Sequence, residues 1–173
     1  HLPFKQAAAV SYGSLTALAF LRDHGKIKKG DRVMIIGASG SVGTYAVQLA
    51  KYYGAEVTGV CSAGNAPLVK SLGADHIIDY RKTALGDLDD SFDIIFDTVG
   101  KYSFNKTRHL LKPDGTYLTT VLSLRSAFDL LKTRRSQQKS ILALTGLRKN
   151  EDKTDDLRFI ADLFKNQRLT AVI

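Results

Sequence analysis

A glycine-rich turn between an apolar run and a helical pattern constrains the fold of this chain more than any other feature. The turn covers residues 37–43, with the sequence Gly-Ala-Ser-Gly-Ser-Val-Gly. Residues 32–36 before it are apolar enough for a buried strand, and residues 42–53 show a helical pattern. A helix that starts at such a turn has free backbone N–H groups, and its dipole favours an anion there. The arrangement therefore predicts a dinucleotide-binding crevice.

Small residues within the turn stand where a dinucleotide fingerprint requires them. Gly40 and Gly43 occupy the second and third glycine positions of Gly-x-Gly-x-x-Gly, so the backbone can approach a pyrophosphate and the helix can pack closely on the strand. Ala38 replaces the first glycine, which requires that its φ stay negative. We expect the cofactor contacts of this turn to come from Ala38, Ser39, Gly40, Ser41, Val42 and Gly43.

Apolar runs and helical patterns alternate along the chain. The expected strands cover residues 32–36, 56–61, 76–79, 93–97 and 116–121, with a further candidate at 140–147. The expected helices cover residues 5–24 (as one or two helices, broken near residues 11–14), 42–53, 65–72, 102–111 and 155–165. Such alternation gives parallel strands joined by right-handed crossovers, so we predict an α/β fold. The predicted architecture is a Rossmann-type doubly wound parallel sheet of about six strands (order 3-2-1-4-5-6) flanked by helices, in one domain of residues 1–173.

The segments between these elements have the composition of loops. Residues 84–91 predict an irregular stretch or one helical turn, and residues 112–115 predict a turn into the fifth strand. Residues 148–154 are interpreted as a polar linker. Residues 169–173 are interpreted as the start of a last strand or the exit from the domain.

Composition narrows the class of protein. No run of apolar residues is long enough for a transmembrane helix, and no leader pattern of a signal peptide is present. Cys61 is the only cysteine, which excludes an internal disulfide framework and fits a reducing compartment, so we expect a cytoplasmic location. The chain begins at His1, which predicts a piece of a longer protein.

The formal net charge of +8 raises the question of a nucleic-acid partner. Basic residues are dense in residues 125–149, but Phe128 is the only aromatic residue there. A nucleic-acid surface would interleave basic side chains with stacking aromatic rings. We therefore interpret the charge as a solvated face that also attracts a phosphate-rich cofactor, and expect no nucleic-acid partner.

The end of the second predicted strand indicates which cofactor is bound. NAD-binding domains usually place an acid there to hold the ribose 2′-hydroxyl. Here the strand ends in Cys61-Ser62, and its acid, Glu56, lies at the opposite end. A serine hydroxyl can donate to a 2′-phosphate, and Tyr80 with Arg81 could close over the same group. The pattern favours NADP(H) over NAD(H); the alternative is that Ser62 only caps the following turn.

Several motifs together carry a family resemblance. They are Gly-Ser-Leu-Thr-Ala at 13–17, Lys-Gly-Asp-Arg-Val at 29–33, the turn at 37–43, Leu-Gly-Ala-Asp at 72–75, Asp-Thr-Val-Gly at 97–100 and Leu-Lys-Pro-Asp-Gly at 111–115. With them the sequence resembles the nucleotide-binding domain of the medium-chain dehydrogenase/reductase superfamily, in its zinc-independent quinone oxidoreductase branch. The resemblance is thin between residues 123 and 153.

The resemblance implies roles for individual residues. It places the pyrophosphate at Ser41 and Val42, the adenosine phosphate at Ser62 and Tyr80, and the nicotinamide end near Thr98, Val99 and Thr120. Two positions depart from the family: Asn65 stands where NADPH enzymes often carry Lys, and Leu18 where Tyr is common. In that family the substrate domain comes from an N-terminal half and a C-terminal segment, which are absent here, so we expect this piece alone to be inactive.

We expect no metal and assign no catalytic residue. Tyr12 stands where zinc-dependent relatives supply a cysteine ligand, and a phenol is a poor substitute for a thiolate. Tyr12 would line the pocket or pack at the edge of the core. Tyr102 and Lys106 spell the Tyr-x-x-x-Lys pair of short-chain dehydrogenases, but they follow the fourth strand instead of the fifth, so the match is interpreted as accidental. Cys61 is interpreted as a small apolar residue.

The resulting hypothesis is the coenzyme domain of an NADPH-dependent oxidoreductase. Hydride would pass to a quinone, enone or similar carbonyl-conjugated substrate, a small molecule held with the help of the missing domain, without zinc. Two alternatives stay open: the enoyl reductase domain of a synthase, and a non-catalytic NADPH-sensing module. The apolar run at 140–147 could also pair edge to edge with a second copy in a homodimer.

Overall fold

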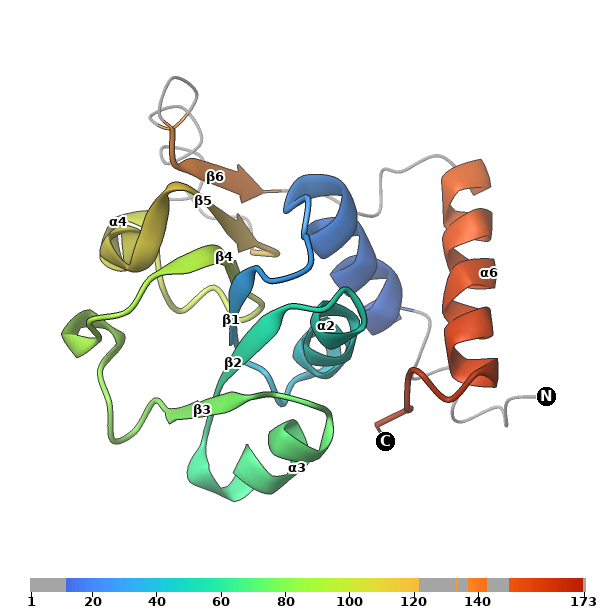
Figure 1. The fold of residues 1–173 in the computed structure, drawn as a ribbon, viewed down its shortest axis with the longest axis horizontal. Helices are drawn as coiled ribbons and strands as arrows, with labels where there is room; N and C mark the ends of the chain where they lie inside the picture. The colour runs from blue at the N-terminus through green and yellow to red at the C-terminus, as the bar shows by residue number, and fades with distance from the viewer. Residues whose placement is uncertain (1–11, 122–132, 134–136, 143–149, 173) are drawn as a thin grey trace.

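The computed structural model describes residues 12–121, 133, 137–142 and 150–172 (Figure 1). Its centre is a six-stranded sheet in which all neighbouring strands are parallel, in the order β3-β2-β1-β4-β5-β6. The strands are β1 (Arg32–Ile36), β2 (Glu56–Cys61), β3 (His76–Asp79), β4 (Phe92–Asp97), β5 (Leu111–Thr119) and β6 (Lys139–Leu142). This topology confirms the predicted Rossmann-type doubly wound sheet.

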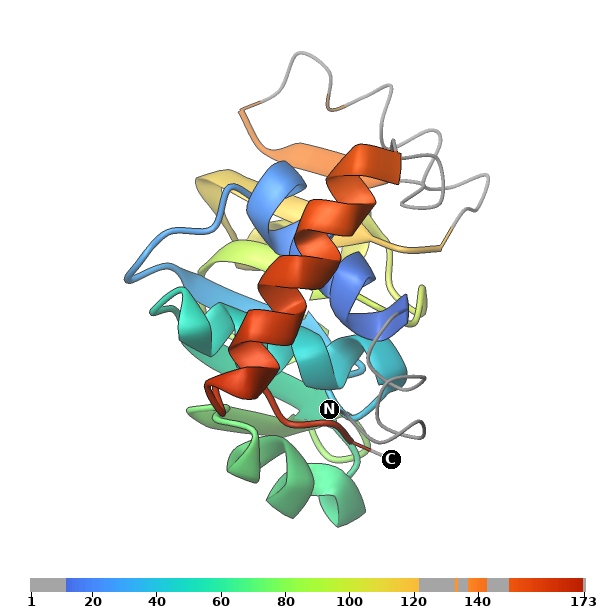
Figure 2. The ribbon, with the colours of Figure 1, turned by 90° about the vertical axis from the view of Figure 1, so that its right-hand side faces the viewer.

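Helices cover both faces of the sheet. The helical segment 12–18 continues into the π-helical η1 (Ala19–His24), so no break occurs from residue 12 onward, and residues 5–11 of the expected helix lie outside the described residues. The other helical elements are α2 (Ser41–Tyr52), η2 (Ala63–Asn65), α3 (Ala66–Ser71), η3 (Leu85–Asp87), α4 (Phe104–Thr107), η4 (Arg108–Leu110) and α6 (Asn150–Lys165). Helix α4 lies on the opposite side of the sheet from α2 (Figure 1), and α6 crosses the outer side of α2 (Figure 2). No described helix has both the length and the apolar character needed to span a membrane.

Strand β1 contributes to both hydrophobic cores, because alternate side chains of a strand point to opposite faces. Val33 and Ile35 are buried in the cluster that includes α2, whereas Met34 and Ile36 are buried in the cluster on the α4 face. A strand covered on both faces is a nearly continuous apolar run, and β1 is apolar and buried from Val33 to Ile36, after Arg32 at its start. Its carboxyl end is thereby held in the middle of the sheet, directly before the glycine-rich turn.

Two predicted boundaries near β5 are wrong. The helix expected over residues 102–111 begins only at Phe104 and ends as the 3-10 turn η4. The turn expected at residues 112–115 lies within β5. The pairing of β4 with β5 shifts register between Phe92 and Ile94, and this irregularity accommodates the additional residues of β5.

The C-terminal expectations are confirmed only in part. Residues 150–154, expected to be a linker, belong to α6, and the acidic residues at its start favour a helix N-terminus. The strand expected over residues 140–147 is β6 in the described part, and residues 143–149 lie outside it, as does most of the basic segment. Residues 169–172 form no strand.

The carboxylate that ends the Leu-Gly-Ala-Asp motif ties α2 to β2. Asp75 accepts a hydrogen bond from the Val57 amide at 2.7 Å and an ion-paired hydrogen bond from the Lys51 ammonium at 2.8 Å. Burial raises the pKa of Asp75, but these donors stabilise its charged form more strongly, so its pKa is lowered overall. The carboxylate therefore stabilises the fold only while it is ionised.

We expect Asp75→Asn to lower the free energy of unfolding at neutral pH by about 1 kcal/mol, since the pair is partly exposed and screened by solvent. The folded pKa lies below the unfolded one, so this stabilisation is complete above the ordinary aspartate pKa and disappears as the pH falls through the lowered folded value. Urea melts of the wild type and the variant should converge over that acidic range. A gap that stays constant at every pH would contradict the linkage.

Candidate functional site

A pocket of about 540 Å³ lies at the carboxyl ends of the central strands. Ile36 at the end of β1, Cys61 at the end of β2 and Thr98 after β4 all line it. Tyr80, directly after β3, lines it from the far side. Doubly wound sheets bind their ligands at this edge, and the volume is within the range of about 300–1,000 Å³ typical of ligand sites. This pocket is the candidate functional site.

The glycine-rich turn brings the first turn of α2 into contact with the end of β1. Gly43 packs so closely that a Cβ atom there would lie 2.1 Å from the carbonyl oxygen of Gly37. Gly37 has a φ of 82°, and a Cβ atom there would lie 2.3 Å from Cγ2 of Val99. Ala38 is not among the described non-glycine residues with positive φ, as its methyl group requires. Both glycines are therefore needed for the backbone path.

The first turn of α2 faces the pocket without a capping side chain. Gly40 is the N-cap residue and has no side chain to accept from the helix amides; its own amide donates to the Gly37 carbonyl oxygen at 2.9 Å. Ser41 and Val42 follow and line the pocket, and no acidic residue lies in this first turn. Free amides and the helix dipole together make this point a site for an anion.

The end of β2 supplies polar groups and no carboxylate. Ser62 lines the pocket, and its hydroxyl makes no capping hydrogen bond to η2, in contrast to the purely structural interpretation of this residue. Asn65 donates from Nδ2 to Oγ of Ser39 at 3.0 Å, which joins η2 to the glycine-rich turn. Glu56 lies at the opposite end of the strand, where it contacts His76 at 3.0 Å. A hydroxyl thus stands where NAD-binding domains usually present an acid.

A buried carboxylate organises the loop after β4. Asp97 has no exposed surface, and its Oδ1 accepts hydrogen bonds from the amides of Val99 (2.9 Å) and Gly100 (2.8 Å). Its Oδ2 accepts from the amide of Tyr102 and the hydroxyl of Tyr117, both at 3.0 Å. Because the backbone wraps around this carboxylate, α4 begins later than the sequence pattern predicts.

Most of the residues predicted to contact the cofactor come together here. Those that line the pocket are Ser39, Gly40, Ser41, Val42, Ser62, Tyr80, Thr98 and Val99. Ala38 and Gly43 are buried behind this lining. Thr120 does not line the pocket, but its hydroxyl donates to the Thr98 carbonyl oxygen at 3.4 Å. Arg81 lies outside the lining, with its guanidinium 5.9 Å from the centre of the Tyr80 ring.

Lys101 is a pocket residue that the sequence pattern did not reveal. It lines the pocket, and its Nζ lies 4.9 Å from the centre of the Tyr80 ring. The available signal was its position shortly after the fourth strand, since the carboxyl ends of parallel strands meet at one edge. A single lysine in a loop belongs to no periodic pattern, however. Only the three-dimensional structure shows that it lies next to Tyr80.

The remaining candidates do not form reactive arrangements. Tyr102 precedes α4, so it does not share a helix face with Lys106, and burial together with the charge of Asp97 raises its pKa, the opposite of an activated phenol. Burial, with a smaller effect of the neighbouring aspartate, also raises the pKa of the Cys61 thiol, as expected for an unreactive cysteine. Tyr12 is 73% exposed and does not line the pocket, so both of its expected placements are wrong.

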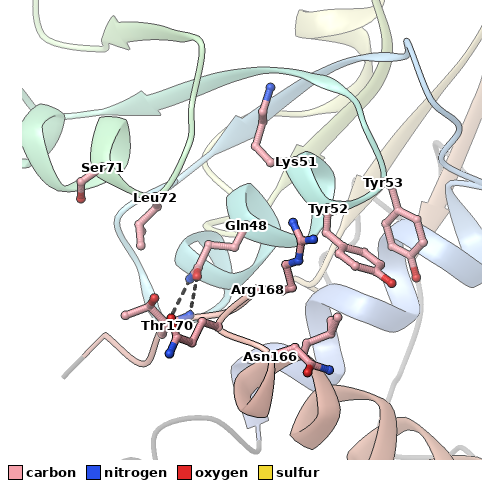
Figure 3. A pocket seen from close by; sticks show the side chains of 11 residues that line it. Gln48, Lys51, Tyr52, Tyr53, Ser71, Leu72, Asn166, Arg168 and Thr170 are labelled. Atoms are coloured by element: carbon pink, nitrogen blue, oxygen red, sulfur yellow. Dashed lines mark hydrogen bonds between the residues drawn. The ribbon is translucent and has the colours of Figure 1, made fainter.

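A larger hollow of about 1210 Å³ lies on the outer side of α2 (Figure 3). Gln48 lines this hollow, and its side chain binds both backbone groups of Thr170. It accepts from the amide at 2.7 Å and donates to the carbonyl oxygen at 3.1 Å. These bonds fasten the C-terminal segment onto α2. None of the predicted cofactor residues lines this hollow, so the smaller pocket is the better candidate for the cofactor.

Comparison with known proteins identifies the family. A family model described as "Zinc-binding dehydrogenase" matches residues 41–162, more than half of the chain. The chain belongs to this dehydrogenase family. Its membership confirms the resemblance to the medium-chain dehydrogenase/reductase superfamily, whose nucleotide-binding fold is the one described above.

Relatives of this dehydrogenase chain are longer than the chain itself. The mitochondrial NAD(P)H oxidoreductase RTN4IP1 of Mus musculus is 40% identical over 132 residues, which cover 69% of this chain and 33% of the relative. The quinone oxidoreductase structure from Coxiella burnetii is 26% identical, with a TM-score of 0.86 over 99% of this chain and 52% of that one. The NADPH complex of Escherichia coli quinone oxidoreductase (21% identical, TM-score 0.85, 99% and 56% covered) shows the shared fold alone. The chain thus spans about a third of the curated relative and about half of the solved structures.

The description of the matched family names zinc. The sequence of this dehydrogenase chain, in contrast, predicts an active site that binds no zinc. Among the described residues, no three His, Cys, Asp or Glu side chains gather as a metal site would require. Tyr12, which stands in place of a cysteine ligand by resemblance, is the residue on which the prediction depends.

We expect Asp97→Ala to lower the free energy of unfolding by about 2–4 kcal/mol, because three backbone amides and the Tyr117 hydroxyl lose a buried acceptor. Tyr117→Phe removes one of these donors and should cost only about 1 kcal/mol. Urea unfolding of both variants measures the difference. Equal losses would show that the carboxylate does not organise this loop.

Proposed function

We propose that this chain is the coenzyme domain of an NADPH-dependent oxidoreductase that reduces a quinone, an enone or a similar carbonyl-conjugated substrate without zinc. The observation that carries the proposal is the pocket at the strand ends, where an uncapped helix N-terminus opens into a lining with no carboxylate among its described residues. The relatives named NAD(P)H oxidoreductase and quinone oxidoreductase support the same class of enzyme.

The residues present fit a phosphorylated dinucleotide. The amides of Ser41 and Val42, at the start of α2, would bind its pyrophosphate. Ser62 and Tyr80 offer hydroxyl groups for the adenosine phosphate, at a point where a carboxylate would repel it. NADPH is therefore the preferred cofactor, and NADH the weaker alternative.

When bound, a nicotinamide cofactor supplies the hydride for such a reduction. The role of this chain is to hold and orient the cofactor. Two residues after β4 contribute to this role in different ways. Thr98 donates its hydroxyl to the Ile36 carbonyl oxygen at 2.9 Å, which fixes the loop against the end of β1. Val99 leaves 55% of its surface exposed, so it presents an apolar wall where the nicotinamide end is expected. The proton of the reaction would come from solvent, a cofactor hydroxyl or a residue outside this sequence.

Further parts of the proposal concern the whole protein. Residues outside this sequence would complete the substrate pocket, with residues 1–173 as the cofactor domain. The strand β6 forms one edge of the sheet, so a second copy could pair there in a homodimer. A cytoplasmic location and the lack of a nucleic-acid partner belong to the same proposal.

The full-length protein that carries this chain should oxidise NADPH when a simple quinone is added, and treatment with a metal chelator should leave the rate unchanged. Loss of NADPH absorbance measures the reaction. Reduction of an enoyl thioester but not of a quinone would favour the enoyl reductase alternative. Tight NADPH binding with no turnover on either substrate would favour the sensing module and contradict a reductase.

We expect Ser62→Asp to weaken NADPH binding by about ten-fold or more and to leave NADH binding unchanged or tighter, because the new carboxylate repels a 2′-phosphate and can accept from a ribose 2′-hydroxyl. Titration of both cofactors measures the effect. Ser71→Asp is the charge-matched control, since Ser71 is exposed on α3 and does not line the pocket. Equal losses for both cofactors would show that Ser62 does not face the adenosine phosphate.

A further inference from the structure

Lys101 is the only charged side chain among the described residues that line the pocket. No ion pair recorded for the described part of the chain involves it. A cation without a carboxylate partner, in a pocket of neutral polar groups, leaves a net positive charge in the lining. Such a charge favours an anionic group on the ligand.

The position of Lys101 shows in which part of the pocket its positive charge lies. Lys101 belongs to the loop after β4, whereas Tyr80 directly follows β3, and β1 and β2 lie between these strands. At about 4.8 Å per strand the two strands are about 14 Å apart. The Lys101 ammonium nevertheless lies 4.9 Å from the centre of the Tyr80 ring. The two side chains therefore meet across the carboxyl ends of the strands between them, on the side of the pocket where Ser62 follows β2.

The other groups near this point are neutral or do not line the pocket. Asn65 carries no charge and is bound to Ser39. Arg81 approaches the Tyr80 ring at 5.9 Å but does not line the pocket. Asp79, which directly precedes Tyr80, accepts from the Arg81 amide at 3.1 Å and does not line the pocket either. Lys101 is thus the one cation among the described residues that the pocket presents to a ligand.

We propose that Lys101 is the residue that selects 2′-phosphorylated adenosine, acting with the hydroxyls of Ser62 and Tyr80. The assignment rests on the proposed function, because it needs an adenine dinucleotide in this pocket. Contact with the Tyr80 ring favours a position of the flexible lysine over the pocket, so less side-chain freedom is lost when an anion binds. The pyrophosphate has its own site at the start of α2, on main-chain amides, and leaves the lysine for the second phosphate.

The test compares ligands that differ only in the 2′-phosphate. The intact protein and its Lys101→Met variant are titrated with 2′,5′-ADP and 5′-AMP, and with NADPH and NADH. We expect Lys101→Met to weaken 2′,5′-ADP and NADPH by about ten-fold and to change 5′-AMP and NADH less than about two-fold. Added salt should weaken 2′,5′-ADP binding less in the variant than in the wild type.

Two further variants make the result specific. Arg81→Met removes a neighbouring cation that also contacts the Tyr80 ring, and should leave the ratio of 2′,5′-ADP to 5′-AMP affinity near the wild-type value. Lys101→Arg keeps a long cation and should recover most of the lost affinity.

Three outcomes overturn the assignment, and they are distinguishable. Equal losses for phosphorylated and unphosphorylated ligands would mean that Lys101 serves the pyrophosphate or the pocket as a whole. Unchanged affinities would mean that it contacts no ligand. If the wild-type protein bound none of the four ligands, the proposed function itself would fail, and the assignment of Lys101 with it.

Discussion

The contact between the first turn of α2 and the end of β1 is the constraint on which the site depends. Gly43 and Gly37 meet there with no room for a side chain, a Cβ atom on Gly43 lying 2.1 Å from the Gly37 carbonyl oxygen. This approach aims the free amides of the helix into the crevice at the strand ends. A methyl group at Gly43 would push the helix away, and one at Gly37 would clash with Val99 of the loop after β4, so either change would distort the anion site.

A second constraint, the Asp97 carboxylate, places the opposite wall of the same crevice. Because it collects amides from the loop after β4 and the Tyr117 hydroxyl from β5, this loop adopts one path over the strand ends. That path carries Val99 to one part of the pocket and Lys101 to another. The pocket therefore has a main-chain wall made by glycines and a side-chain wall positioned by a buried acid.

The sequence patterns predicted some elements well and others poorly, for physical reasons. Strands β1, β2 and β3 match their predicted bounds, because each contains a short apolar stretch between clear turns. The start of α4 and the course of residues 112–115 were predicted wrongly. There, hydrogen bonds to Asp97 and a register shift between β4 and β5 override the local preference of the chain. Tyr12 was placed by resemblance alone, and its surroundings in the fold differ from both expectations.

The sequence by itself determined the fold class and the glycine-rich turn, since both follow from local composition, and the strand order follows from the dinucleotide-binding fold that the turn indicates. It also placed most of the pocket lining, because the ends of parallel strands collect at one edge. Only the tertiary structure decided that Lys101 meets Tyr80 across two intervening strands and that Asp97 holds the loop that carries Lys101. Those contacts join residues far apart in the chain, and their distances depend on how the whole sheet is assembled.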